Sequence, residues 1–146
     1  LFSFNGIDCV SNTDRRLILS EIFRVLKPGG TFMFSSHNRS YKHFNKLPWK
    51  RKTEYSLGFL RFCLFGLRYL PTHLKMKRHE VFKDEYALVN DIDHRFSVLF
   101  YYITIDKQRD QLRAAGFSDI EAYDHRGRLV EADTESHWIY YLARKL

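Results

Sequence analysis

The sequence is poor in the residues that mark disulfide-rich, metal-binding and transmembrane proteins. Its two cysteines, Cys9 and Cys63, lie far apart, which argues against a disulfide framework and favours a reducing, cytoplasmic location. The seven histidines never take H-E-x-x-H spacing and no C-x-x-C occurs, so no metal site is predicted. No apolar run reaches the roughly 18 residues that a membrane-spanning helix requires. We therefore expect a cytoplasmic protein without a metal centre or a transmembrane segment.

Several common catalytic signatures are also missing. The chain has no P-loop and no G-x-S-x-G nucleophile elbow, and its seven glycines never form G-x-G-x-G. Disorder is excluded as well, because 45% of the residues are hydrophobic and 16% are aromatic. A chain of 146 residues is long enough to bury a core, as one domain or as part of one.

Acidic residues are scarce in the middle of the chain. In residues 39–78 Glu54 is the only acid against eleven Lys and Arg, and the rest of the chain is slightly acidic. This segment includes the apolar stretch 56–70, which we predict to be a helix with Arg61 and Arg68 on one face. Three interpretations of this segment stay open: it binds an acidic partner such as nucleic acid, it contacts an anionic membrane, or it is a solvated lid.

The clearest structural signal is a helix, a turn and a strand in direct succession. Apolar residues at helical spacing predict a helix from Thr13 to Lys27, with Asn12 or Thr13 as its N-cap. Pro28-Gly29-Gly30 ends that helix, and residues 31–36 form a short apolar strand. A helix that returns through a glycine turn into a buried strand indicates a parallel α/β sheet.

This stretch closely resembles the class I S-adenosylmethionine-dependent methyltransferases. In that family an R-x-L-K-P-G-G segment joins the helix after the fourth strand to the fifth strand. The matching residues here are Arg24, Leu26, Lys27, Pro28, Gly29 and Gly30. The later phrase Q-L-R-A-A-G-F-S-D-I-E-A-Y, residues 111–123, resembles the family's helix-to-strand step near its C-terminus.

The resemblance covers residues 1–38 and 99–146 and implies a partial Rossmann-like α/β sheet. Its last two strands would form an antiparallel hairpin at the sheet edge. Residues 39–98 would be a basic, aromatic-rich helical insertion that could act as a lid over the substrate. We expect extended structure over 79–104, and the further elements follow from local pattern: strands at 1–6, 96–104, 118–124 and 138–144, and helices at 56–70 and 105–115.

The family's glycine-rich cofactor loop would lie upstream of the fourth strand, and this chain does not contain it. We therefore expect the C-terminal half of a methyltransferase, with weak or no binding of S-adenosylmethionine and no activity by itself. Residues 1–5 would leave an unpaired apolar strand at a sheet edge, which favours homo-oligomers.

Candidate site residues follow from the rule that ligands bind beyond the carboxyl ends of parallel strands. The resemblance implies that the turn after the first strand contacts the cofactor. These cofactor-binding candidates are Phe4, Asn5, Gly6 and Ile7. His37, at the end of the next strand, is the candidate general base. Asn38, Tyr101 and Tyr102 are candidates for contacts with the substrate.

Simpler interpretations stand beside these assignments. Asn5-Gly6 could be only a turn, His37 could only form a structural hydrogen bond, and methyl transfer can proceed by alignment without a base. Asp91, Asp93 and His94 are expected to form a solvated loop. We expect the acceptor to be a small molecule rather than nucleic acid. The alternative to an enzyme is a basic binding module for nucleic acid or an anionic membrane.

Overall fold

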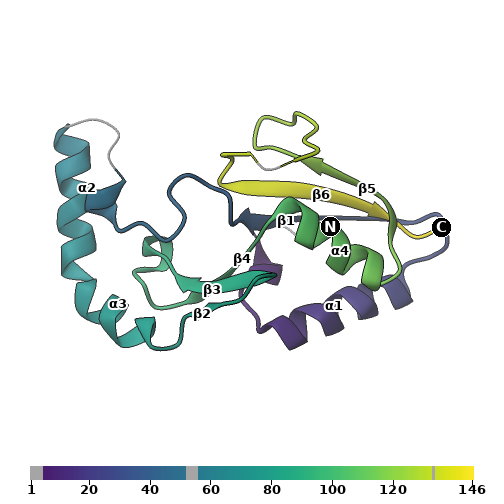
Figure 1. The fold of residues 1–146 in the computed structure, drawn as a ribbon, viewed down its shortest axis with the longest axis horizontal. Helices are drawn as coiled ribbons and strands as arrows, with labels where there is room; N and C mark the ends of the chain where they lie inside the picture. Colours follow the sequence, from purple (N-terminus) through teal and green to yellow (C-terminus); the bar gives the residue numbers. More distant parts are fainter. Residues whose placement is uncertain (1–4, 52–55, 133) are drawn as a thin grey trace.

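The computed structural model describes residues 5–51, 56–132 and 134–146 (Figure 1). The helices are α1 (Asn12–Val25), α2 (Leu57–Arg68), α3 (Leu70–Lys77) and α4 (Ile105–Ala114). The strands are β1 (Thr31–Asn38), β2 (Val81–Phe82), β3 (Tyr86–Asn90), β4 (Leu99–Ile103), β5 (Ser118–Tyr123) and β6 (Trp138–Arg144). Three short 3-10 turns are η1 (Gly6–Asp8), η2 (Pro48–Lys50) and η3 (Ile92–His94).

The strands form one six-stranded mixed sheet in the order β2-β3-β4-β1-β6-β5. β1 and β4 run parallel, with His37 opposite Tyr102, so their carboxyl ends meet at the same edge. β6 pairs antiparallel with both β1 and β5. The predicted α/β class and the final antiparallel hairpin are therefore confirmed.

The turn between α1 and β1 explains the Pro-Gly-Gly sequence. Gly29 has a positive φ of 75°, and its N–H donates to the carbonyl of Lys145 at 2.7 Å. The Lys145 N–H donates in return to the carbonyl of Gly30 at 3.0 Å. A Cβ at Gly30 would lie 2.7 Å from the Leu26 side chain. The glycines thus let the turn fold tightly against the end of β6.

The N-cap prediction for α1 was wrong by one residue. Ser11 caps the helix, since its hydroxyl accepts from the Asp14 N–H at 3.1 Å. Asn12 is the first helical residue, and its side chain is used elsewhere, as an acceptor for the Tyr101 hydroxyl. The strand predicted at 1–6 is also wrong at its end, because Asn5 is left-handed (φ 51°) and Gly6 begins η1. Residues 1–4 lie outside the described part of the chain.

The middle segment differs from the single helix expected at 56–70. The helix ends at Arg68, and after Tyr69 a second helix, α3, begins with Pro71 in its first turn. The extended structure expected over 79–104 is interrupted by η3, and its strand begins at Leu99 instead of Phe96. β2 and β3 then extend the sheet beyond β4. Within the described residues no helix has both the length and the apolarity to cross a membrane.

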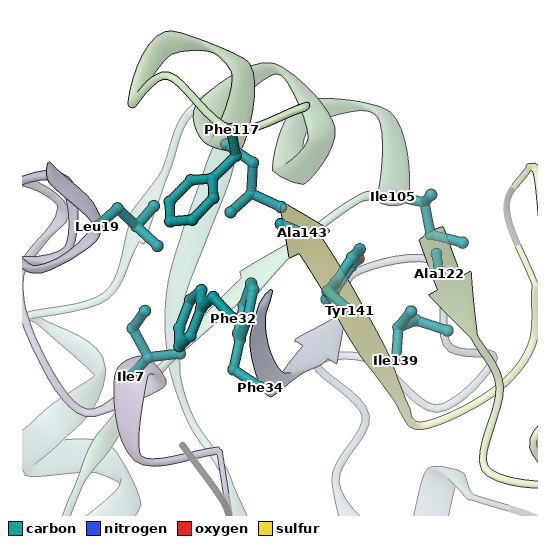
Figure 2. Close-up of a cluster of buried hydrophobic side chains, with 11 residues drawn as sticks. Ile7, Leu19, Phe32, Phe34, Ile105, Phe117, Ala122, Ile139, Tyr141 and Ala143 are labelled. Carbon is teal, nitrogen blue, oxygen red and sulfur yellow. The ribbon is translucent and has the colours of Figure 1, made fainter. Parts of the chain in front are cut away.

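The main core lies between one face of the sheet and the two helices α1 and α4 (Figure 2). Strand alternation places Phe32 and Phe34 of β1 in this core and leaves Met33 exposed on the other face. Phe34 stacks on Tyr141 of β6 at a ring-centroid distance of 5.2 Å. Full burial of one such aromatic side chain contributes about 1.5–3 kcal/mol. Leu19 from α1 completes the contact and fixes the helix over the sheet.

The turn after β5 is held by the buried Asp124 carboxylate. It accepts hydrogen bonds from the Arg128 N–H at 3.0 Å and the Arg126 N–H at 2.8 Å, and pairs with the Arg128 guanidinium at 2.7 Å. The Arg128 N–H above all, with the Arg128 side chain and the Arg126 N–H, lowers the pKa of Asp124 to about 2 against the opposing effect of burial.

Asp124→Asn is therefore expected to change the acid stability of the fold. Because the folded-state pKa is lowered, the ionised carboxylate stabilises the native state above about pH 4, and this contribution disappears as the pH falls toward 2. The variant should melt at a lower temperature near neutrality and lose less stability than wild type between pH 4 and 2. Thermal melts followed by circular dichroism measure both effects. Asp119→Asn, at an exposed position 3.9 Å from Arg144, is the matched control and should follow wild type.

Candidate functional site

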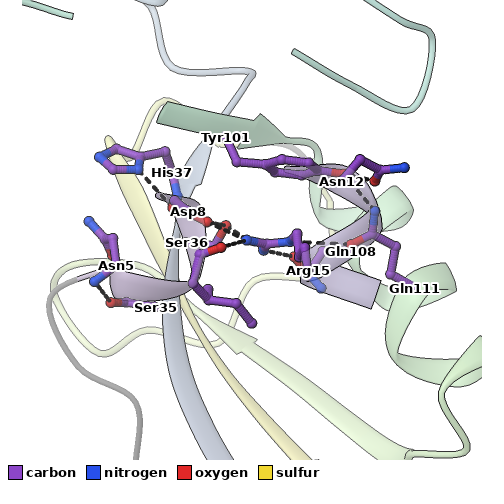
Figure 3. A network of polar contacts seen from close by, with 11 residues as sticks. Asn5, Asp8, Asn12, Arg15, Ser35, Ser36, His37, Tyr101, Gln108 and Gln111 are labelled. Atoms are coloured by element: carbon purple, nitrogen blue, oxygen red, sulfur yellow. Dashed lines mark hydrogen bonds and ion pairs between the residues drawn. The ribbon is translucent and has the colours of Figure 1, made fainter. Parts of the chain in front are cut away.

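A buried carboxylate, Asp8, organises a polar network at the carboxyl end of β1 (Figure 3). Its Oδ1 accepts from the Ser36 hydroxyl at 2.7 Å and from the Arg15 guanidinium at 2.6 Å. Its Oδ2 accepts from the His37 backbone N–H at 2.6 Å and pairs with His37 Nδ1 at 2.7 Å. Four partners therefore hold the carboxylate in one orientation.

Arg15 is fully buried although it carries a charge. Besides Asp8 it donates to the Ile7 carbonyl at 2.8 Å, to the Ser36 hydroxyl at 3.0 Å and to Gln108 Oε1 at 2.6 Å. A longer bond of 3.4 Å joins its Nε to Gln111 Oε1. This arrangement uses the fork of guanidinium donors to lock η1, β1 and α4 together.

Tyr101 also belongs to this network and packs its ring on Arg15. The guanidinium carbon lies 4.4 Å from the centroid of the Tyr101 ring, within the range of a cation–π contact. The hydroxyl donates to Asn12 Oδ1 and accepts from Gln111 Nε2, both at 2.7 Å. Burial raises the pKa of Tyr101 to about 12, so the phenol stays neutral at physiological pH. Tyr101 was expected to contact substrate, and its side chain is fully enclosed by protein here.

His37 presents one nitrogen to Asp8 and has the other available. Because an ionised carboxylate only accepts, the Asp8 contact places the proton on Nδ1 and leaves a lone pair on Nε2. No hydrogen bond to Nε2 is found among the described residues. His37 is only 6% exposed, and its ring lies 5.0–5.1 Å, centroid to centroid, from the rings of Tyr102 and Phe100. A carboxylate–histidine pair of this kind can orient an imidazole to take up a proton.

A second buried acid, Asp91, contacts Tyr102. Its carboxylate pairs with Arg51 at 2.6 Å and accepts from the Tyr102 hydroxyl at 2.7 Å. Burial by itself would raise the pKa of Asp91, but the charge of Arg51, together with hydrogen bonds from Tyr102, Arg51 and the Ile92 N–H, lowers it. The solvated loop expected here was wrong for Asp91, which is buried, although His94 is exposed.

Asp91 also lines a cavity of about 270 Å³ between η2, α3 and β3. Its basic lining residues are Lys46, Lys50, Arg51, His73 and Lys77. Tyr102 lies between Asp91 and His37, because its hydroxyl binds Asp91 while its ring packs on the imidazole. In the described residues no cluster of three or more His, Cys, Asp or Glu side chains could hold a metal ion.

The other predicted residues occupy different positions around this network. Asn5 donates its backbone N–H to Ser35 Oγ at 3.1 Å, and its buried Oδ1 has no partner among the described residues. Gly6 and Ile7 belong to η1, and the Ile7 side chain lies in the hydrophobic core. Phe4 lies outside the described residues.

Asn38 fastens the chain that precedes β6. Its amide nitrogen donates to the carbonyls of Thr134 at 2.6 Å and Ser136 at 2.9 Å. Its amide oxygen accepts from the Ser40 N–H at 3.0 Å. These bonds use the side chain structurally, and a contact with substrate remains a prediction.

The sequence interpretation missed the centre of the site, namely Asp8, Arg15, Gln108 and Gln111. One signal was present. Arg15 lies four residues before Leu19 and therefore falls on the inward, apolar stripe of α1. A charged residue on such a stripe requires a buried partner.

Comparisons with known proteins give little further information. No protein-family model and no curated protein matches the chain. Among solved structures, it is similar to a SAM-dependent methyltransferase from Thermotoga maritima, a possible histamine N-methyltransferase, with a TM-score of 0.49 and 16% identity. The match covers 94% of this chain and 51% of that protein, so the chain spans about half of its length. At this level of similarity the likeness does not bear on activity.

Proposed function

We propose that the chain forms the C-terminal half of an S-adenosylmethionine-dependent methyltransferase in which His37 is the general base. The observation that carries the proposal is the Asp8–His37 pair at the carboxyl end of β1, where open α/β sheets bind their ligands. The resemblance of residues 24–30 to the family's helix-to-strand segment supports the class, and the final antiparallel hairpin agrees with it.

In this mechanism His37 Nε2 removes a proton from the O–H or N–H group of the methyl acceptor. The acceptor atom then has the electron pair that forms the new bond to carbon. Asp8 holds the Nδ1–H and stabilises the imidazolium that results, while Arg15 and Ser36 keep the carboxylate in place. S-adenosylmethionine, when bound, would supply the electrophilic methyl group, and its sulfur would keep the electron pair of the broken S–CH3 bond and leave as S-adenosylhomocysteine.

One described residue fits the cofactor in particular. Asn5 has a buried amide oxygen without a partner among the described residues, and such an acceptor suits a charged N–H donor like the amino group of a methionine moiety. Gly6, next to it, has no side chain and allows close approach of a ligand to the backbone. Asn5 would therefore hold the amino-acid end of the cofactor.

We further propose a small-molecule acceptor, with part of residues 39–98 acting as the lid. The cavity of about 270 Å³ beside Asp91 is close to the lower limit of small-molecule pockets. Residues from η2 and α3 line it, so this segment would cover the bound acceptor. Its lysines favour an acceptor that carries negative charge.

Calorimetric titration with S-adenosylhomocysteine tests the cofactor assignment. The chain of residues 1–146 alone should show weak or no binding, and micromolar affinity would contradict the half-domain proposal. The protein encoded by the complete reading frame should bind it. There, Asn5→Ala should weaken binding about 10-fold or more, because a hydrogen bond to a charged group is lost. Asn45→Ala is the matched control, since Asn45 has the same left-handed backbone (φ 53°) in an exposed loop. An equal effect of both substitutions would remove Asn5 from the cofactor site.

A further inference from the structure

Helix α2 carries a stripe of leucines that faces away from the protein. Leu57, Leu60, Leu64 and Leu67 are spaced by three, four and three residues, which places them on one side of a helix. They are 68%, 53%, 56% and 51% exposed, and Leu74 on α3 is 61% exposed. Single exposed leucines are common in proteins, whereas four on one side of one helix form an apolar stripe that calls for a partner.

The inner side of α2 fixes this orientation. Gly66 is buried against η2, and a Cβ at this position would lie 2.6 Å from the Pro48 ring. Because Gly66 is two residues from Leu64, the two positions lie on nearly opposite sides of the helix. In Figure 1 α2 stands at one end of the molecule, apart from α1 and α4. The leucine stripe is therefore presented outward by packing.

Positive charge borders the stripe. α2 and α3 contain no acidic residue, and Arg61 and Arg68 lie seven positions apart beside the leucines. Two more basic residues, Lys75 and Arg78, follow at the end of α3. None of these four forms an ion pair with a described residue, so their charges are available to an external partner.

We propose that the outer face of α2 and α3 binds the surface of an anionic membrane, with its leucines at the boundary between headgroups and acyl chains. Apolar side chains next to exposed arginines and lysines are the composition of an interfacial helix. A nucleic acid would use the charges but would have no use for the leucine stripe. A second copy would bring two basic surfaces together, and 12 residues are too short for a coiled coil of about three heptads. This proposal is independent of methyltransferase activity.

Sedimentation of the chain with lipid vesicles tests the proposal. At low salt the protein should bind phosphatidylcholine vesicles containing about 30% phosphatidylglycerol at least 10-fold more tightly than pure phosphatidylcholine vesicles, and added NaCl should weaken this binding. The double variant Leu60→Gln and Leu64→Gln should lose at least 10-fold in affinity. Arg61→Gln with Arg68→Gln should reduce the preference for the anionic vesicles.

The matched control is Leu17→Gln with Leu129→Gln, two leucines that are 60% and 57% exposed elsewhere on the protein. This variant should bind like wild type, and circular dichroism verifies that every variant is folded. Wild-type protein that does not sediment with anionic vesicles overturns the proposal, as does equal binding by the Leu60 and Leu64 variant. Two further results would assign the leucine stripe to another partner and would also overturn the proposal. One is a dimer in light scattering that this variant abolishes, and the other is binding of labelled polyuridylate that only the arginine variant abolishes.

Discussion

Replacing Arg15 with alanine is expected to lower the free energy of unfolding by about 3–5 kcal/mol, because it leaves the Asp8 carboxylate buried without its charge partner. Both side chains of this pair are fully buried, so bulk water does not screen the carboxylate that is left. The substitution also removes donors from Gln108 and from the Ile7 carbonyl. Urea unfolding followed by circular dichroism at neutral pH measures the change.

The neighbouring Arg16 gives a matched control for this prediction. It pairs with Glu85 at 2.9 Å, but the two side chains are 45% and 48% exposed. Arg16→Ala should therefore lower the free energy of unfolding by only about 0–1 kcal/mol. A double variant, Asp8→Ala with Arg15→Met, removes both buried charges and should be more stable than Arg15→Ala alone. Equal losses for Arg15→Ala and Arg16→Ala would show that the buried network does not stabilise the fold.

Local signals in the sequence were sufficient for the elements that surround the site. The strand predicted at 138–144 has the same limits as β6, and the Pro-Gly-Gly turn lies where helix periodicity ends. These elements depend on neighbouring residues: β-branched and aromatic runs for strands, and glycine for a left-handed turn. One helix was predicted at 56–70, but the chain forms two helices there, because Pro71 cannot continue α2 and suits the first turn of a new helix.

The site was only partly predictable, for reasons of sequence distance. His37 could be identified because it lies at the carboxyl end of a strand, and the strand-end rule needs no knowledge of its partners. The contacts of Arg15 with Gln108 and Gln111, in contrast, join residues 93 and 96 positions apart. Asp91 was misassigned for the same reason, since Arg51, which neutralises it, comes from 40 residues earlier. A local pattern can show that a charged residue needs a buried partner, as for Arg15, but it does not show which distant residue supplies that partner.

Replacing His37 with glutamine is expected to lower the turnover of the complete methyltransferase about 10²–10⁴-fold, the usual contribution of a general base. Glutamine has similar length and keeps a polar group near Asp8, but it cannot accept and release the acceptor's proton. The measurement is the rate of S-adenosylhomocysteine release with a small-molecule acceptor that supports turnover. The control is His79→Gln, at an exposed histidine that accepts a hydrogen bond from its neighbour Arg78, and this variant should keep wild-type activity.

The dependence of this effect on pH separates a base from a residue that only positions the acceptor. A general base reacts only with its lone pair free, so turnover by the wild type should have an acid limb that the glutamine variant lacks. The affinity for S-adenosylhomocysteine should be nearly unchanged, because the proposed cofactor contact is at Asn5 instead. If alignment of the acceptor with the methyl group suffices, the loss will stay below about 10-fold and the pH profiles will coincide. The Asp8 carboxylate would then serve to fix β1 against η1, and the base would have to be sought in the acceptor or outside the described residues.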